Sequence, residues 1–195
     1  LEALGATKAP QAKTVVAASL RSVEPSVRKA AANTLAKLND PTAAALLLPV
    51  LKDKEAGVRI AAIQALGVLK AKDAIPALIQ ATGDNATQFD AITALAMMPD
   101  KRALSAYLTG LASKNVDLRK VCRQAIAALR EDVVPTLQQL AKGNEIPSAA
   151  LAELREVYSS FVPILSWRVI GPFPREGKAH PPQRERKFDA VYKGA

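Results

Sequence analysis

The sequence has few of the residues on which enzyme chemistry usually depends. Its 195 residues include one cysteine, Cys122, and one histidine, His180. No disulfide can form within the chain, and a cysteine-based metal site cannot be assembled. His180 lies in a basic, proline-flanked stretch far along the sequence from Cys122, so we expect an exposed loop residue and not a catalytic base. The nine glycines are dispersed and form no phosphate-binding loop. We therefore expect no catalytic residue, no metal site and no cofactor.

Aromatic residues and long apolar runs are also scarce. Aromatics make up 4% of a chain that is 49% hydrophobic, so small aliphatic side chains must form the core. The longest apolar block, AAALLLPVL at residues 43–51, is too short to span a bilayer. The sequence opens with LEALGA, which has the pattern of a helix end and no leader pattern. We predict no membrane span in this chain, and we interpret the chain as a fragment of a longer protein.

A nine-residue motif recurs along the chain. It begins at Val27 (VRKAAANTL), Val58 (VRIAAIQAL), Thr87 (TQFDAITAL), Leu118 (LRKVCRQAI) and, weakly, Ile146 (IPSAALAEL), at intervals of 31, 29, 31 and 28 residues. Such intervals accommodate two short helices and two turns. An isolated pair could not bury its apolar face, whereas stacked pairs share one continuous core. The sequence predicts an all-α fold, an α-solenoid of about five helical pairs over residues 1–158.

Turn residues between the motifs support this division. Pro41 follows Asp40, which fits a helix start with proline at the first position. A first helix should then run through TAAALLLPVLK, with a kink at Pro49. Pro99-Asp100 and Gly143-Asn144 combine a helix stop with a cap for the next helix. Small oxygen-bearing residues precede the first four motifs by five residues, and we expect them to cap the second helices: Ser22, Asp53, Thr82 and Ser113.

The segment LKDKEAGVRIAAIQALGVLKAKDAIPALIQA at residues 51–81 resembles the HEAT repeats, in particular the short bacterial HEAT-like repeats. The resemblance covers roughly residues 1–158. It implies that the arginine at the second motif position bridges to an acid in a neighbouring turn. Arg28, Arg59 and Arg119 would then form a structural ladder with turn acids such as Asp53. Gln88 and Pro147 depart from the pattern at this position.

The composition changes after Tyr158. Residues 159–195 are rich in proline and aromatics, and ILSWRVI alternates as a β-strand does. We predict a domain boundary here, with residues 159–195 either capping the solenoid or beginning a β domain. The segment resembles the start of a β-sandwich module that follows HEAT-like repeats in large exported bacterial proteins. The matching interdomain residues are Trp167, Gly171, Pro172, Phe173 and Pro174.

That second resemblance implies an exported, periplasmic parent protein in which the repeats have neighbouring domains. Some of the large exported proteins of this kind carry dehydrogenase-like and cytochrome c domains. The chain has no Cys-x-x-Cys-His sequence, so no haem is expected here. On this hypothesis the repeats are a structural spacer in a multidomain enzyme, and catalysis occurs elsewhere.

The favoured hypothesis is a non-enzymatic scaffold or protein-interaction module. Its second helices would line a concave face that binds a protein partner, with contacts from Lys29, Phe89, Lys120 and Arg123. The net charge of +9 leaves nucleic-acid binding as an alternative, as in HEAT-like DNA glycosylases. We do not favour it, because Phe89 and its neighbours interrupt the basic stripe.

Overall fold

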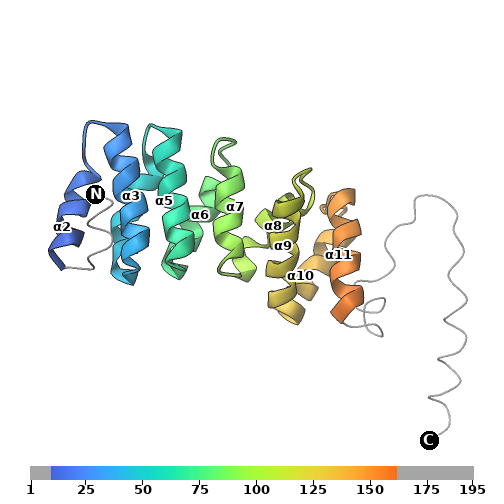
Figure 1. Ribbon diagram of the computed structural model, residues 1–195. Helices are drawn as coiled ribbons and strands as arrows, with labels where there is room; N and C mark the ends of the chain where they lie inside the picture. The colour runs from blue at the N-terminus through green and yellow to red at the C-terminus, as the bar shows by residue number, and fades with distance from the viewer. Residues whose placement is uncertain (1–9, 162–195) are drawn as a thin grey trace, which may run out of the picture.

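The computed structural model describes residues 10–161, which form two layers of short helices stacked in one elongated row (Figure 1). The first layer contains α2 (Pro10–Ser19), α4 (Ala44–Leu47), α6 (Ile75–Ala81), α8 (Leu104–Leu111) and α10 (Val134–Lys142). The second layer contains α3 (Pro25–Leu38), α5 (Ala56–Val68), α7 (Gln88–Ala96), α9 (Val116–Leu129) and α11 (Ser148–Phe161). The predicted all-α solenoid of five helical pairs is confirmed.

We number the helical pairs as repeats 1 to 5 and call the interface between successive repeats a joint. In the second layer each helix packs on the next: α3 on α5, α5 on α7, α7 on α9 and α9 on α11. Short 3-10 turns open the later repeats: η1 (Pro41–Ala43), η3 (Lys72–Ala74), η4 (Lys101–Ala103) and η5 (Arg130–Val133). Each repeat therefore contacts mainly its neighbours, as a solenoid requires.

The first helix of repeat 2 is shorter than predicted. Residues 42–52 were expected to form one kinked helix, but α4 spans only four residues and is followed by the 3-10 turn η2 (Pro49–Lys52). Pro49 has no amide hydrogen and its ring clashes with the preceding turn, so the α-helical pattern stops before it. The α-helix also starts later than predicted, at Ala44, because Pro41–Ala43 form the 3-10 turn η1, which Asp40 opens by accepting a hydrogen bond from the amide of Thr42 at 2.9 Å.

The expectation that small oxygen-bearing residues cap the second helices is wrong. The side chains of Ser22, Asp53 and Ser113 accept hydrogen bonds from the amides two residues later, at 3.3, 2.9 and 3.1 Å. These bonds close a tight turn before the helix begins. In repeat 3, Asp84 makes this turn bond at 2.9 Å, while the Thr82 hydroxyl donates back to the preceding helix. The residues order the turns that lead into the helices.

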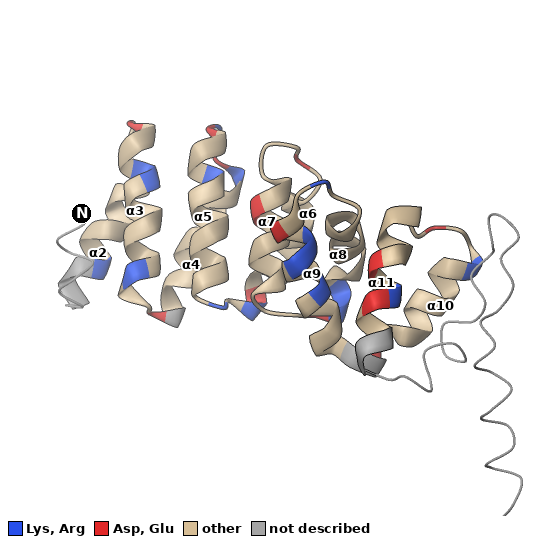
Figure 2. Ribbon diagram, turned by 45° about the vertical axis from the view of Figure 1, so that its right-hand side comes forward, with Lys and Arg blue, Asp and Glu red and all other residues tan. Residues whose placement is uncertain are grey.

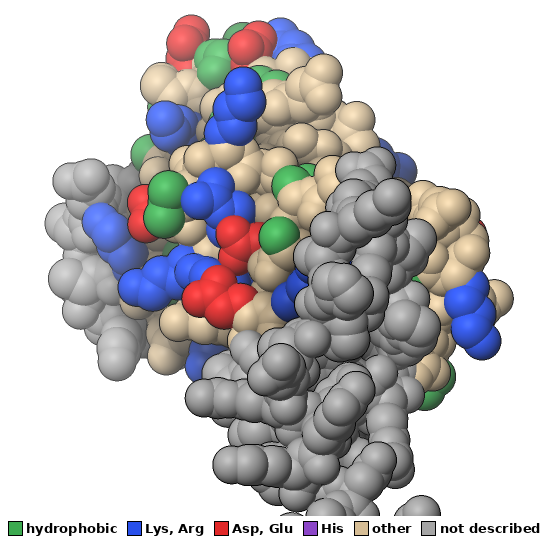
Figure 3. Space-filling model, turned by 90° about the vertical axis from the view of Figure 1, so that its right-hand side faces the viewer, with side chains coloured by type: hydrophobic (Ala, Val, Ile, Leu, Met, Phe, Trp, Pro, Cys, Tyr) green, Lys and Arg blue, Asp and Glu red, His purple; other side chains and the backbone are tan. Residues whose placement is uncertain are grey.

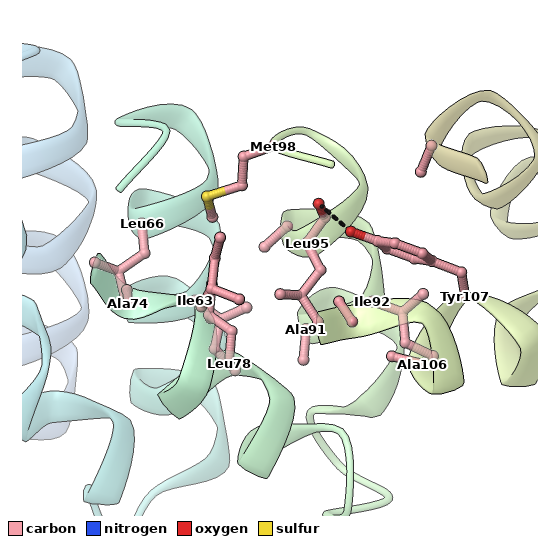
Figure 4. Close-up of a cluster of buried hydrophobic side chains, with 14 of the residues drawn as sticks. Ile63, Leu66, Ala74, Leu78, Ala91, Ile92, Leu95, Met98, Ala106 and Tyr107 are labelled. Carbon is pink, nitrogen blue, oxygen red and sulfur yellow. Dashed lines mark hydrogen bonds between the residues drawn. The ribbon is translucent and has the colours of Figure 1, made fainter. Parts of the chain in front are cut away.

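The core consists of small and branched aliphatic side chains, as the composition predicted. Figure 4 shows one cluster in which side chains from α5, α6, α7 and α8 meet between the two layers. Alanines on the inner side of the second helices are buried, such as Ala61, Ala62 and Ala91, and a Cβ atom added to Gly67 of α5 would lie 3.0 Å from the Cβ of Ala94 in α7. Small residues at these positions let neighbouring helices approach closely.

The last described helix, α11, continues to Phe161, three residues past the predicted domain boundary at 158. The predicted interdomain residues lie outside the described residues: Trp167, Gly171, Pro172, Phe173 and Pro174. Within residues 10–161, no helix has both the length and the apolar character needed to cross a membrane.

Candidate functional site

The second helices share one register, so equivalent residues form rows across the array. Counting the first residue of the motif as position 1, positions 3, 7 and 11 recur on the side of each helix that is turned away from the first layer. We call this surface the second-helix face. Its members in α3, α5, α7 and α9 are all exposed or partly exposed: Lys29, Asn33, Lys37, Ile60, Gln64, Val68, Phe89, Thr93, Met97, Lys120, Gln124 and Ala128.

An open groove of about 520 Å³ lies on this face between α3 and α5. Lys29, Asn33 and Lys37 line it from α3, and Gln64 and Val68 line it from α5. The groove combines two cations, two amide side chains and an apolar edge. Such a lining suits a polypeptide chain, which presents polar and apolar groups together.

Apolar side chains are exposed at the middle of the second-helix face. Val68 is 50% exposed, Phe89 45% and Met97 44%. A Cβ atom on Gly67 would lie 3.2 Å from the sulfur of Met97, which places Met97 against α5 next to Val68. Half of the large hydrophobic side chains that the structure shows as exposed therefore lie on this one face, which is a feature of interaction surfaces.

Arg123, which we predicted to bind a partner, is engaged within the array. Its guanidinium lies 3.2 Å from a carboxylate oxygen of Glu153 and 2.7 Å from one of Glu156, both on α11. Arg119 lies 3.0 Å from the other oxygen of Glu153. These pairs join α9 to α11, and Figure 3 shows basic and acidic side chains interleaved at this end of the molecule. Arg123 thus holds repeat 5 in place.

Lys29 and Lys120, by contrast, are exposed and form no ion pair among the residues that the structure describes. Both occupy position 3 of the motif, in α3 and α9, and Phe89 occupies the same position in α7. Figure 2 shows basic segments on α3 and α9 with acidic segments between and beyond them. The sequence analysis did not single out Val68 or Met97, although their position eight residues after position 3 places them on the same side of the helix.

The arginine at motif position 2 in repeat 1 contacts both its own turn and the next. Arg28 is only 7% exposed and binds the Asp53 carboxylate through two nitrogens, at 2.7 and 2.8 Å. Its remaining terminal nitrogen donates to the carbonyl oxygens of Ser22 and Val23, each at 2.9 Å. The hydrogen bond from Arg28 is the main cause that holds the pKa of Asp53 below its usual value.

The same geometry continues into repeat 3. Arg59 donates to the carbonyl oxygen of Asp53 at 2.9 Å and to the Asp84 carboxylate at 2.7 Å. Asp53 therefore receives Arg28 on its side chain and Arg59 on its backbone, which links three successive turns. Arg119 keeps the bond to its own turn, to Ser113 O at 2.9 Å, but its acid is Glu153 on α11.

The ladder is interrupted between repeats 3 and 4. Gln88 keeps the bond to its own turn, donating to the carbonyl oxygen of Thr82 at 3.0 Å. The position 25 residues later, which is Asp53 for Arg28 and Asp84 for Arg59, is Ser113. Both the cation and the acid of this rung are absent from the sequence.

Cys122 does not reach the second-helix face. Cys122 is fully buried, and burial raises the pKa of its thiol to about 12. In the part of the chain that the structure describes, no three His, Cys, Asp or Glu side chains gather as metal ligands would. His180 lies outside that part.

Comparisons with known proteins agree with the repeat pattern. The family described as HEAT repeats matches the chain twice, over residues 1–67 and residues 44–130. Among solved structures, a similar one is the complex of CpcE and CpcF of phycocyanin lyase from Nostoc sp. PCC7120. It is 22% identical, the match covers 83% of this chain and 72% of that chain, and the TM-score is 0.46. No curated protein matches the chain.

Proposed function

Since this chain belongs to the HEAT repeat family, we propose that it is a non-enzymatic interaction module that binds a protein partner on its second-helix face. The observation that carries the proposal is the exposure of Val68, Phe89 and Met97 on one face, beside an open groove. Exposed apolar side chains within a polar surround are typical of protein-binding surfaces.

The mechanism would be one of shape. The partner would contact side chains from successive second helices, each contributing a modest free energy. The ion-pair ladder lies at the turns, away from the face, so it can fix the spacing of the helices without competing with the partner. Phe89 is the strongest candidate for a central contact, because exposed aromatic residues contribute most at the middle of an interface. Lys29 and Lys120 would flank it.

Affinity capture from extracts of the source cells tests the proposal, with quantitative mass spectrometry on the full chain. We expect Phe89→Ala to reduce capture of the main partner by about tenfold or more, since central aromatic contacts contribute at least 1–2 kcal/mol. Val23→Ala is the matched control, because Val23 is 89% exposed but lies in a turn off the face. Equal loss with both variants, or no loss with Phe89→Ala, would refute the proposal.

We also propose that the repeat array and residues 159–195 are separate structural units. The change in composition after Tyr158 supports this, and the helical boundary is best drawn after Phe161, where α11 ends. Limited proteolysis of the full chain with mass spectrometry should give a stable fragment ending near that residue. A chain protected throughout would contradict two units.

A further inference from the structure

The second-helix face carries positive charge that the array does not use. Lys29 and Lys37 on α3 and Lys120 on α9 are exposed, with no ion pair among the described residues. Acids are present near the face, but most of them are bound to other side chains of the array and not to these lysines. Three cations are therefore available to a ligand at two ends of the same surface.

Two acids at this surface are bound within the array, and a third, Asp117, lies one turn before Lys120 on α9. An Asp90 carboxylate oxygen accepts a hydrogen bond from the Gln64 side-chain amide at 2.8 Å. Glu156 at the far end is paired with Arg123 at 2.7 Å. The surface from α3 to α9 thus carries three lysines and two carboxylates, Asp90 near its centre and Asp117 beside Lys120, so its net charge is positive and greatest along α3.

The centre between the lysines is apolar. Val68, Phe89 and Met97 lie on α5 and α7, between the cations of α3 and the cation of α9. A nucleic acid backbone would meet hydrophobic side chains and the Asp90 carboxylate at this point, where its phosphates need cations. A polypeptide with apolar side chains in its middle and carboxylates toward both ends would match the lysines of α3, the apolar side chains of α5 and α7, and the lysine of α9.

We propose that the second-helix face binds an acidic, amphipathic segment of a partner protein, an inference that rests on the proposed interaction function. Apolar side chains of the segment would cover Phe89 and Met97, and its carboxylates would pair with Lys29, Lys37 and Lys120. Neighbouring packed helices lie 8–10 Å apart, so three joints from α3 to α9 span about 30 Å. A helix of about 20 residues, or an extended segment of about nine, covers that distance.

The test uses the full chain, immobilised, and a displayed library of random peptides, followed by affinity measurements on enriched peptides. The face variant is the triple substitution Lys29→Glu, Lys37→Glu and Lys120→Glu. The control triple changes the net charge equally at exposed lysines in turns and 3-10 segments off the face: Lys72→Glu, Lys101→Glu and Lys114→Glu. Circular dichroism checks that both triples keep the helical content of the original chain.

We expect enriched peptides to combine Asp or Glu with apolar residues. The face triple should weaken their binding by about a hundredfold, since each rim charge contributes up to about fivefold in affinity, whereas the control triple should change it by less than about threefold. Enriched peptides without acidic residues, or peptides insensitive to the face triple, would overturn the inference. If peptides that are insensitive to the face triple still lost affinity with Phe89→Ala, the proposed interaction function would stand, and only the inference of an acidic segment would fail.

Two other outcomes also count against the acidic segment. A single-stranded DNA oligonucleotide that binds more tightly than any peptide, with the same dependence on the face lysines, would assign the charge to nucleic acid. No enrichment of any peptide would argue against the proposed function and the inference together.

Discussion

Neighbouring joints of the array are held by different kinds of interaction. Between repeats 2 and 3, an ion pair joins Arg59 of α5 to Asp84 in the next turn at 2.7 Å, and the Gln64 amide of α5 donates to the Asp90 carboxylate of α7 at 2.8 Å. Between repeats 3 and 4, no ion pair crosses the joint among the described residues. Each of the other joints has at least one such pair.

The joint between repeats 3 and 4 has a buried neutral hydrogen bond in its place. The hydroxyl of Tyr107 in α8 donates to the carbonyl oxygen of Leu95 in α7 at 3.0 Å (Figure 4). It also accepts from the amide of Asp100 at 3.3 Å. Tyr107 is fully buried, and burial raises its pKa to about 12, so it stays neutral. The comparison shows that one fold can join its repeats either by charge at the turns or by packing and a neutral bond in the core.

The largest effect should follow from removing packing at the joint that lacks ion pairs. Ile92 of α7 is buried and lies against Gly110 of α8, whose added Cβ would be 3.1 Å from it. Ile92→Ala should lower the free energy of unfolding by about 3 kcal/mol. Hydrogen exchange should show repeats 4 and 5 opening separately from repeats 1–3, because no ion pair among the described residues joins repeat 3 to repeat 4.

Ile63→Ala is the matched control, since Ile63 is buried at the same motif position in α5. Its loss of stability should be similar, but the ion pairs of its joint should keep repeats 2 and 3 opening together. Identical exchange profiles for the two variants would remove the distinction between the joints.

The next effect comes from breaking the ladder at its least exposed rung. Asp53→Asn removes the charge that faces Arg28, whose side chain is 9% exposed. We expect a loss of about 2 kcal/mol, because hydrogen bonds between charged groups that are largely shielded from water contribute 1.5–3 kcal/mol. Chemical denaturation measures it. A loss no greater than that of Asp73→Asn, an exposed aspartate for which the structure shows no ion pair, would contradict the role of the ladder.

Acid should act on the same joints. Arg28 lowers the pKa of Asp53, and the hydrogen bond from Lys13 is the main cause that lowers that of Asp40 to about 2. A depressed carboxyl pKa stabilises the fold above the ordinary value of about 3.9, and that stability is lost as the pH falls through the lower folded value. Exchange measured between about pH 4 and pH 2 should therefore show the joints among repeats 1–3 loosening before the joint between repeats 3 and 4. The reverse order would contradict this assignment.

A smaller effect is expected from the neutral bond. Tyr107→Phe leaves the Leu95 carbonyl and the Asp100 amide without this partner and should cost about 1 kcal/mol. The loss should be the same at low and high salt, because no charge is involved. A loss that shrinks as salt is added would show that the hydroxyl acts through neighbouring charges instead.

The smallest effect should come from restoring the missing rung. Gln88→Arg with Ser113→Asp recreates the 25-residue separation of the other rungs. The pair should stabilise the array by up to about 1 kcal/mol at low salt, and less at high salt. A double-mutant cycle isolates the coupling, and a coupling of zero would mean that this joint is too differently spaced to hold the pair.

The sequence predicted the repeats and their number because small apolar residues recur at helical spacing from Val27 onward. It did not predict the breakdown of the first helix around Pro49 or the true role of the turn residues such as Asp53, since both depend on local backbone geometry. Arg123 was predicted to be available to a partner. Its pairing with Glu153 and Glu156 depends on how α11 docks, and no local pattern encodes that contact.

The close packing of Gly110 against Cys122 allows the rate at which α8 and α9 separate to be measured. A Cβ on Gly110 would lie 2.3 Å from the Cys122 sulfur, so the thiol is enclosed between α8 and α9. Cys122 is the only cysteine in the sequence. A thiol reagent can therefore modify the native chain only when these helices separate, and the rate of modification reports the opening of repeat 4 without any introduced label.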